Sequence, residues 1–265
     1  TAPAPKMVTM PVVDIAALPE GIAQMDWPAL QSAVSACMGC GLSQGRQQAI
    51  LGEGPATSDW MVVGDAPGED EDKAGTSFAG PAGQLLDNML KALGLTRSQV
   101  YITHALKCRT PTGRSASQVE VSHCATYLAR QVALVQPKVI LAMGRFAVQA
   151  LLQTTEPLGK LRGQLHTFQG VPVVVTYHPA YLLRNPADKA KAWDDLRSIA
   201  ALAAEAGRGV TGLAMANKMV DMLRDIRLSL DQGRELSNAM ARHQDLFGGF
   251  YISMIRVGEM TGRLT

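Results

Sequence analysis

The sequence lacks several features that would assign a protein class at once. Its 265 residues carry a net charge of only +2, so no strong overall field points to one kind of partner. No apolar run is long enough to span a membrane, and the Ala- and Pro-rich start has no signal-peptide pattern. We therefore expect a cytoplasmic protein with a flexible tail over residues 1–26. If nucleic acid binds, a local patch must hold it.

Cysteine is also scarce, with only 4 residues in the chain. In the cytoplasm such cysteines serve metal or redox chemistry more often than disulfides. They comprise one Cys-x-x-Cys pair and two later residues: Cys37, Cys40, Cys108 and Cys124. This spacing suits a zinc ion or an iron–sulfur cluster and leaves both open, along with four unrelated buried thiols. Near Cys108 lie cations that a folded loop would present to a phosphate backbone: Lys107, Arg109 and Arg114.

Four apolar, β-rich segments predict strands at 60–64, 100–103, 138–144 and 171–177. They are apolar throughout, which is typical of strands buried on both faces of a sheet. Amphipathic segments between and after them predict helices at 82–94, 117–137, 144–154 and 188–207. The alternation indicates an α/β fold with a mainly parallel, four-stranded sheet, whose ligands gather at the carboxyl ends of the strands.

The pattern changes after residue 207. A glycine-rich break, "GRGVTG", precedes a stretch that is helical in pattern throughout. We therefore expect a separate, small all-helical module over residues 208–265.

The segment "VVGDAPGEDED" (62–72) follows the first predicted strand. A glycine turn at this place often cradles phosphate with backbone N–H groups. Five carboxylates argue against that use here, because they would repel a phosphate: Asp65, Glu69, Asp70, Glu71 and Asp72.

Four stretches together resemble the family 4 uracil-DNA glycosylases, the iron–sulfur type. They are "CMGCGLSQGR", "VVGDAPGEDEDKAGTSFAGPAGQLLDNML", "YITHALKCRTP" and "VVVTYHPAYLLRNPADKAKAWDDL". The resemblance covers about residues 27–200 and predicts a glycosylase domain over 27–207, built as a three-layer sandwich. It implies excision of uracil from DNA in base excision repair, and a [4Fe–4S] cluster on the four cysteines, with zinc a minor alternative.

The resemblance implies that the acidic loop binds a flipped-out base rather than a phosphate. Its backbone would then approach the base and sugar at Gly64, Ala66, Pro67 and Gly68. Asp65 and Glu71 become the catalytic carboxylates, which stabilise a cation-like sugar and position water. The family usually carries Glu where Asp65 stands. For Asp70 and Asp72 we expect only a solvated acidic surface.

Three rings complete the site that the resemblance implies. Phe78 would stack on uracil, and His178 would donate to a uracil carbonyl as charge develops on the leaving base. His104 stands where the family usually carries Asn, and three hypotheses follow. It still donates to uracil with weaker discrimination, or it turns away and activity falls, or it attacks the sugar covalently. The covalent branch of the family has a basic insert that this sequence lacks.

The string after His178 predicts the contact with DNA. Tyr181, Leu182 and Leu183 would wedge the strand at the flipped site, and Arg184 would meet a phosphate. The alternative for these four residues is packing at the start of a helix.

Residues from about 210 to 265 resemble a fragment of the type II secretion system protein F family and its type IV pilus relatives, carried by "GEMTGRL" near the end. Apolar positions in it would need burial on the first domain or on a protein partner: Phe247, Phe250, Tyr251 and Ile252. Two alternatives to the glycosylase remain open. One is an iron–sulfur DNA-binding protein with weak or no catalysis; the other is a fusion whose tail serves secretion or pilus assembly.

Overall fold

The computed structural model describes residues 19–205, 222, 225–243 and 255–256. The chain divides into two compact units, one within residues 1–208 and the other mostly within residues 209–265. The first unit contains the sheet and the cavity described below.

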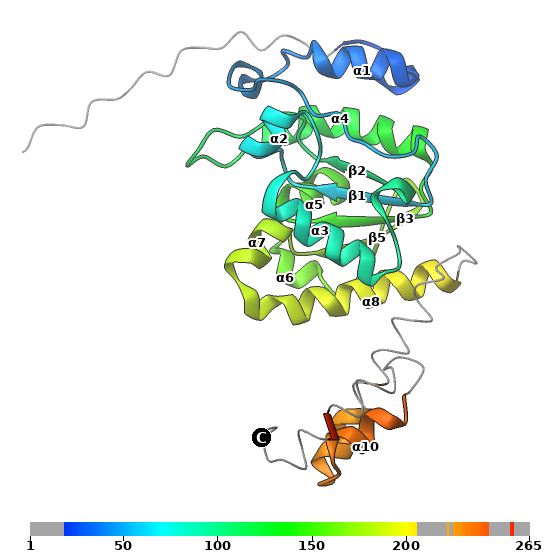
Figure 1. Ribbon diagram of the computed structural model, residues 1–265. Helices are drawn as coiled ribbons and strands as arrows, with labels where there is room; N and C mark the ends of the chain where they lie inside the picture. The colour runs from blue at the N-terminus through cyan, green and yellow to red at the C-terminus, as the bar shows by residue number, and fades with distance from the viewer. Residues whose placement is uncertain (1–18, 206–221, 223–224, 244–254, 257–265) are drawn as a thin grey trace, which may run out of the picture. The chain divides into compact units, whose positions relative to one another are not determined.

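The first unit is built around a five-stranded sheet in the order β2-β1-β3-β5-β4 (Figure 1). The strands are β1 (Trp60–Gly64), β2 (Val100–His104), β3 (Val139–Met143), β4 (Leu165–Phe168) and β5 (Val171–Thr176). The pairs β1–β2, β1–β3 and β3–β5 are parallel, and β4 is antiparallel to β5. The sequence-predicted strands are confirmed, because β1, β2 and β3 are buried at every residue, as their apolar runs require.

The prediction of four strands was wrong by one. Strand β4 lies at the sheet edge, and its residues alternate between exposed and half-buried, so it has no apolar run. A two-residue turn joins it to β5. Gln169 and Gly170 both have positive φ, 50° and 79°, as this class of hairpin turn requires.

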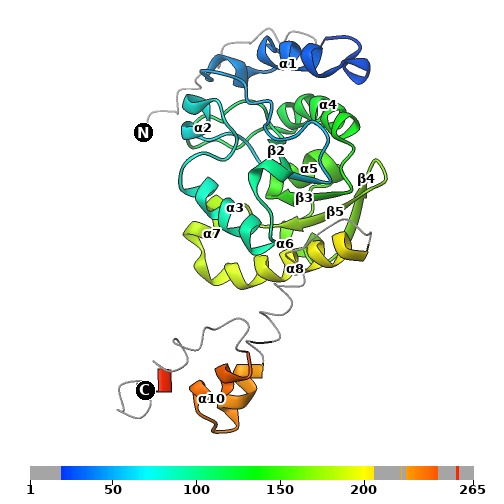
Figure 2. The ribbon, with the colours of Figure 1, turned by 45° about the vertical axis from the view of Figure 1, so that its right-hand side comes forward.

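Helices cover both faces of the sheet and confirm the three-layer architecture (Figure 2). One layer contains α4 (Gln118–Val135) and α5 (Arg145–Leu152), whose apolar side chains share a core with β1, β3 and β5. The other contains α3 (Gly80–Ala92) and α8 (Lys189–Glu205), which packs on β3 and β5. These four are the helices that the sequence predicted, within two residues at most ends.

Shorter elements complete the first unit. They are η1 (Ile22–Gln24), α1 (Trp27–Ser35), η2 (Gly41–Gln44), α2 (Glu69–Ala74), η3 (Arg97–Gln99), α6 (Leu158–Leu161), α7 (Pro179–Arg184) and η4 (Pro186–Asp188). Helices α2 and α7 begin just after β1 and β5, so the sheet edge fixes the loops that precede them.

The described part of the second unit is helical, as expected. It includes residues 225–231 and α10 (Leu236–Ala241). Met222, Ile226, Ala239 and Met240 form its small apolar core. The predicted exposed apolar positions at 247 and 250–252 lie outside the described residues.

Candidate functional site

The carboxyl ends of β1, β3 and β5 open into one cavity of about 610 Å³. Parallel strands end at the same sheet edge, so the loops that follow them meet there. The cavity is lined by Asp65, Ala66, Pro67, Gly68, Thr110, Gly144, Arg145, Phe146, Leu158, Tyr177, His178, Ala180, Tyr181 and Arg184. The predicted glycine turn and the predicted histidine thus lie in one site, although more than 100 residues separate them in the chain.

Asp65 lies directly after β1 and faces the start of α5. Its Oδ1 accepts hydrogen bonds from the amides of Phe146 (2.7 Å) and Ala147 (3.1 Å). Burial raises the pKa of Asp65 to about 6, and these amides oppose the rise. Gly144 has no room for a side chain, because a Cβ would stand 2.3 Å from the Asp65 carboxylate. The cavity therefore contains a carboxylate that helix α5 holds in a fixed place.

His178 begins α7 and presents one nitrogen to the helix. The Ala180 amide donates to His178 Nδ1 at 3.2 Å, so in the neutral ring the proton resides on Nε2. Burial, with a contribution from Arg184, lowers the pKa of His178 to about 4, so the ring is neutral at pH 7. Nε2 is buried and has no hydrogen-bond partner among the described residues. His178 therefore offers an unused N–H donor.

Phe78 lies against both imidazoles. Its ring centroid is 4.7 Å from that of His104 and 5.3 Å from that of His178, with interplanar angles of 21° and 19°. A Cβ on Gly64 would stand 2.5 Å from the Phe78 ring, so the close approach requires glycine. Three ring systems that the sequence predicted as one site are therefore brought together, although only His178 is among the residues that line the cavity.

His104 ends strand β2 and is 1% exposed. Burial lowers the pKa of His104 well below its usual value, and His178 and Lys107 add to the effect. Both ring nitrogens are buried without a hydrogen-bond partner in the described part of the chain. Its backbone is held by buried Lys107, whose Nζ donates to the His104 carbonyl at 2.6 Å. The sequence linked Lys107 to phosphate, and the structure instead buries it, with its Nζ bonded to Thr103 and His104.

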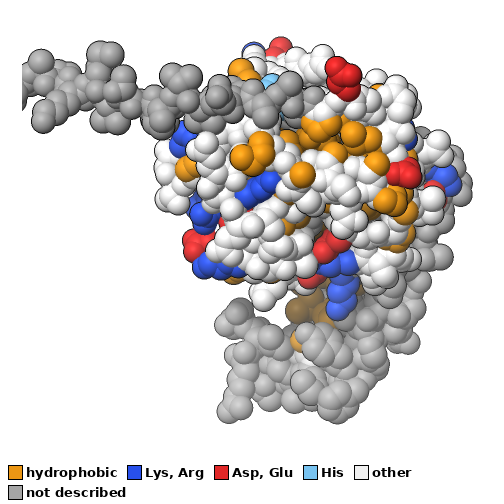
Figure 3. Space-filling model, turned by 90° about the horizontal axis from the view of Figure 1, so that it is seen from above, with side chains coloured by type: hydrophobic (Ala, Val, Ile, Leu, Met, Phe, Trp, Pro, Cys, Tyr) orange, Lys and Arg blue, Asp and Glu red, His pale blue; other side chains and the backbone are white. Residues whose placement is uncertain are grey.

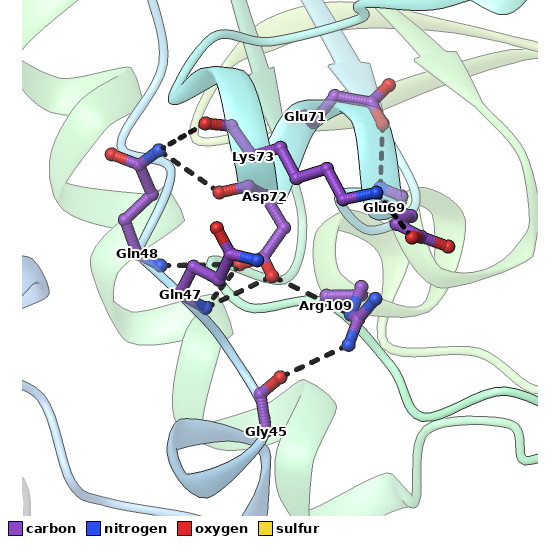
Figure 4. A network of polar contacts seen from close by, with 9 residues as sticks. Gly45, Gln47, Gln48, Glu69, Glu71, Asp72, Lys73 and Arg109 are labelled. Carbon is purple, nitrogen blue, oxygen red and sulfur yellow. Dashed lines mark hydrogen bonds and ion pairs between the residues drawn. The ribbon is translucent and has the colours of Figure 1, made fainter.

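Glu71 lies in α2 and bends back over the first turn of that helix. The Gly68 amide donates to Glu71 Oε2 at 2.9 Å, and the side chain is buried. Burial raises the pKa of Glu71, although the amide of Gly68 opposes the rise. Glu71, drawn in Figure 4, is not among the residues that line the cavity, but its partner Gly68 is, so Glu71 acts on the site through Gly68.

Asp72 contradicts the prediction of a solvated acidic residue, because it is 1% exposed. The amide of Gln47 donates to both carboxylate oxygens (2.9 and 3.0 Å), and that of Gln48 donates at 3.3 Å (Figure 4). Arg109 adds an ion pair at 3.7 Å. Asp72 therefore ties α2 to the segment that follows the Cys-x-x-Cys pair. Asp70 is exposed, as predicted.

The predicted DNA wedge divides into buried and exposed residues. Leu182 is only 2% exposed, whereas Leu183 is 42% exposed and Arg184 is also at the surface. Tyr181 stacks on Tyr177 at 4.9 Å and donates from its hydroxyl to Asp188 at 2.7 Å. Of these four residues, Leu183 and Arg184 are the two whose side chains are exposed and have no hydrogen-bond partner in the described part of the chain.

The two basic residues near Cys108 are engaged within the fold. Arg114 donates to both carboxylate oxygens of Glu120 at 2.9 Å, and Arg109 pairs with Asp72. On the face shown in Figure 3, basic and acidic side chains are interspersed rather than gathered by sign. The cavity itself is lined by two basic residues, Arg145 and Arg184.

Some cavity residues were missed by the sequence predictions. They are Arg145, which stands over the ring of Phe146 at 4.7 Å, Phe146 itself, and Tyr177, whose ring lies 4.4 Å from the guanidinium of Arg162 outside the lining. The only available signal was position: Arg145, Phe146 and Tyr177 directly follow strands β3 and β5.

Comparison with known proteins assigns the family. A model described as the uracil DNA glycosylase superfamily matches residues 51–197. A type-4 uracil-DNA glycosylase of Pyrobaculum aerophilum is 38% identical over 182 residues, which are 65% of this chain and 92% of the relative. This chain belongs to the uracil-DNA glycosylase superfamily.

Further superfamily relatives agree. A type-4 uracil-DNA glycosylase of Sulfurisphaera tokodaii is 38% identical over 66% of this chain and 83% of its own length. A type-5 uracil-DNA glycosylase of Pyrobaculum aerophilum is 33% identical over 47% of this chain and 62% of the relative. A second family model, type II secretion system protein F, matches residues 197–265, as the resemblance predicted. Among the described helices, none combines the length and apolar character needed to cross a membrane.

The four cysteines of this superfamily member come from three segments of the chain. Cys40, Cys108 and Cys124 are buried, Cys37 is half-buried, and none forms a disulfide. Burial raises the pKa of Cys40, Cys108 and Cys124, to about 12 for Cys124, because the charged thiolate loses its hydration in the interior. Within the described residues, no three Cys, His, Asp or Glu side chains meet closely enough to hold a single metal ion.

Arg46 links two of these cysteine segments. Its Nη1 donates to Cys108 Sγ at 2.9 Å, and its Nη2 donates to the Cys37 carbonyl at 3.0 Å. Four thiols, one of them accepting a hydrogen bond from a guanidinium, are a donor set that fits an iron–sulfur cluster.

Proposed function

We propose that this protein removes uracil from DNA by hydrolysing the N-glycosidic bond, leaving an abasic site. The observation that carries the proposal is the unpaired Nε2–H of His178 beside the Phe78 ring, in a cavity that also contains the Asp65 carboxylate. The names of the 35–38% identical relatives support the same activity. The substrate is uracil-containing DNA, so the protein would work in the compartment that contains the chromosome, which for a bacterium or archaeon is the cytoplasm.

The proposed chemistry follows from these groups. As the bond between uracil N1 and the sugar C1′ breaks, its electron pair stays on uracil and positive charge develops on the sugar. His178 donates from Nε2 to a uracil carbonyl oxygen, where negative charge grows. The Asp65 carboxylate stabilises the sugar cation and orients the water that adds to C1′. Uracil then takes up a proton as it leaves. Phe78 holds the flipped base by stacking.

For the remaining loop residues we propose supporting roles. Glu71 holds Gly68 and thereby the turn that carries Asp65, rather than touching the substrate. The backbone of Gly64, Ala66 and Pro67 forms the near wall for the base and sugar. His104, a neutral ring with one donor and one acceptor nitrogen, reads the polar edge of uracil in place of the usual amide.

We further propose that Cys37, Cys40, Cys108 and Cys124 hold a [4Fe–4S] cluster. The cluster would bind the segment after Cys40 to the body of the fold. Two amides of that segment, those of Gln47 and Gln48, donate to Asp72 of α2, so the cluster would support helix α2 and the turn before it. In this role the cluster is structural, and no step of the hydrolysis passes through it.

For DNA we propose that Leu183 enters the space left by the flipped base. Arg184 contacts a phosphate, with Arg109, Arg114 and Tyr181 at the margin of the same surface and Leu182 as its buried support. Residues 27–207 would form the glycosylase domain and residues 208–265 a secretion-protein-F-like module. A protein partner for this module is supported by Leu228 and Leu230, which are 54% and 44% exposed.

The test is incubation of the purified protein with an end-labelled oligonucleotide that contains one uracil, followed by mild alkali and a denaturing gel. We expect cleavage at the uracil and none in a matched oligonucleotide with cytosine there. An intact uracil strand, from folded protein that carries its iron, would favour the DNA-binding alternative. A heat-stable protein–DNA band would instead indicate covalent attack by His104.

A further inference from the structure

The backbone at Phe78 adopts a conformation that a bulky residue rarely holds. Its φ is +52°, in the left-handed region. Such a conformation costs free energy and persists only where neighbouring groups enforce it. The Phe78 ring is 1% exposed and lies within about 20° of parallel to the imidazoles of His104 and His178. We therefore looked for side chains that bind the backbone of residues 77 and 78 and hold it in this conformation.

Arg97 makes the contacts that hold them. Its Nη1 donates to the Ser77 carbonyl at 2.9 Å, and its Nη2 donates to the Phe78 carbonyl at 2.8 Å. One planar guanidinium thus donates to two successive carbonyls, a geometry that fixes the peptide between them. Gly83 of α3 lies under the same Phe78 carbonyl, where no Cβ would fit.

Arg97 is itself fixed from two sides. Its Nε donates to Asp87 of α3 at 2.6 Å, and its Nη1 donates to Glu53 at 2.7 Å. Glu53 exchanges two backbone hydrogen bonds of 2.8 Å with Ile102, in the middle of β2. Because β2 also ends in His104, Arg97 connects the backbone of Phe78 to the strand that carries its stacking partner.

We infer that Arg97 is a positioning residue for uracil excision, which holds the Phe78 ring parallel to the imidazoles of His104 and His178. This inference rests on the proposed function. Arg97 does not line the cavity, so it acts through Phe78 and touches no reacting atom. Neither the family resemblance nor the sequence pattern singled it out.

Arg97→Lys in the full chain is the test. Lysine keeps the positive charge beside Glu53 and Asp87 but lacks the planar fork, so it cannot hold both carbonyls. Stacking contributes to the bound base and the transition state alike, so its loss raises KM more than it lowers kcat. We expect the KM for a uracil-containing oligonucleotide to rise about tenfold, the size of a weakened base stack.

A double-variant cycle separates positioning from general destabilisation. Phe78→Ala alone should raise KM, and adding Arg97→Lys to it should change KM little further, because both act through one ring. If Arg97 only stabilised the fold, Arg97→Lys would raise KM by the same factor in the unaltered protein and in the Phe78→Ala variant. The matched control is Arg197→Lys, at the exposed pair with Asp194 (3.9 Å), whose KM should not move.

The outcomes are distinct. If the unaltered protein excises uracil and Phe78→Ala raises KM, but Arg97→Lys does not, the inference is wrong while the proposed function stands. If the unaltered, folded protein excises no uracil, the proposed function fails and the inference falls with it. Should Arg97→Lys not fold, Asp87→Asn replaces it, since Asp87 is half exposed and anchors one edge of the guanidinium. A smaller rise in KM is then expected, and an unchanged KM would overturn the inference.

Discussion

The loop after β1 and the loop after β5 both line the cavity and differ in how their polar groups are paired. In the first, residues 64–72, buried Glu71 and Asp72 both accept hydrogen bonds from backbone amides. In the second, residues 177–184, His178 uses Nδ1 for the helix and leaves Nε2 unpaired. A buried donor without a partner costs about 1–3 kcal/mol, so its retention points to a substrate. The pairing of Glu71 and Asp72 indicates a structural role, and the unpaired imidazole nitrogen of His178 indicates a functional one.

The largest expected effect is on His178. His178→Ala removes the Nε2–H donor, and we expect the excision rate to fall about 10²–10³-fold, as for other groups that stabilise developing charge. His178→Asn is the matched control, because its side chain can still cap α7 but cannot donate from the Nε2 position. Both variants should lose activity, with the smaller loss of stability in the Asn variant. Single-turnover assays measure the excision rate, and thermal unfolding measures the stability. Near-normal excision rates in both variants would show that the unpaired nitrogen of His178 has no catalytic role.

Asp72→Ala tests the first of these loops. It leaves the amides of Gln47 and Gln48 without this acceptor, so the free energy of unfolding should fall by about 1–3 kcal/mol. Asp70→Ala, at an exposed position in the same helix, should change it by less than about 0.5 kcal/mol. Urea unfolding of both variants makes the measurement. Equal changes in the unfolding free energy of the two variants would show that the hydrogen bonds of Asp72 contribute nothing to stability.

Asp65→Asn should separate stability from activity. Burial raises the pKa of Asp65 from 3.8 to about 6, so the native state binds the proton more tightly than the unfolded state. This carboxyl therefore destabilises the fold increasingly as pH rises from about 4 to about 6. At pH 7 the variant should be more stable by about 2 kcal/mol, with the gain vanishing below about pH 4, and excision should be lost. Urea unfolding across this pH range checks the sign; a less stable variant at pH 7 would refute it.

The smallest effect is expected for Glu71→Gln. The amide oxygen can still accept from Gly68, so unfolding free energy should change by about 1 kcal/mol or less and excision should persist. A loss of excision as large as that of His178→Ala would restore Glu71 to the catalytic role predicted from the sequence.

The sequence predicted the fold well because its strands are buried on both faces and its helices end at clear boundaries. It missed β4, since an edge strand with exposed side chains has no apolar run. It brought the ring residues together correctly, but it could not show which nitrogen of His178 is free, because that depends on the Ala180 amide in the folded chain.

Other errors have the same origin. Asp72 looked solvated because its partners lie some 25 residues earlier in the sequence. Leu182 and Leu183 looked alike, and only the direction of each side chain on α7 decides which one is buried. Pairing and orientation are properties of the fold, so the sequence alone does not distinguish them.

The most direct test of the central claim is nitrogen NMR of the His178 imidazole at pH 7, assigned by comparison with His178→Asn, before and after addition of free uracil. The account predicts a neutral ring protonated at Nε2, whose Nε2 resonance shifts when uracil binds. A ring protonated at Nδ1, or an Nε2 resonance that uracil leaves unchanged, would contradict it.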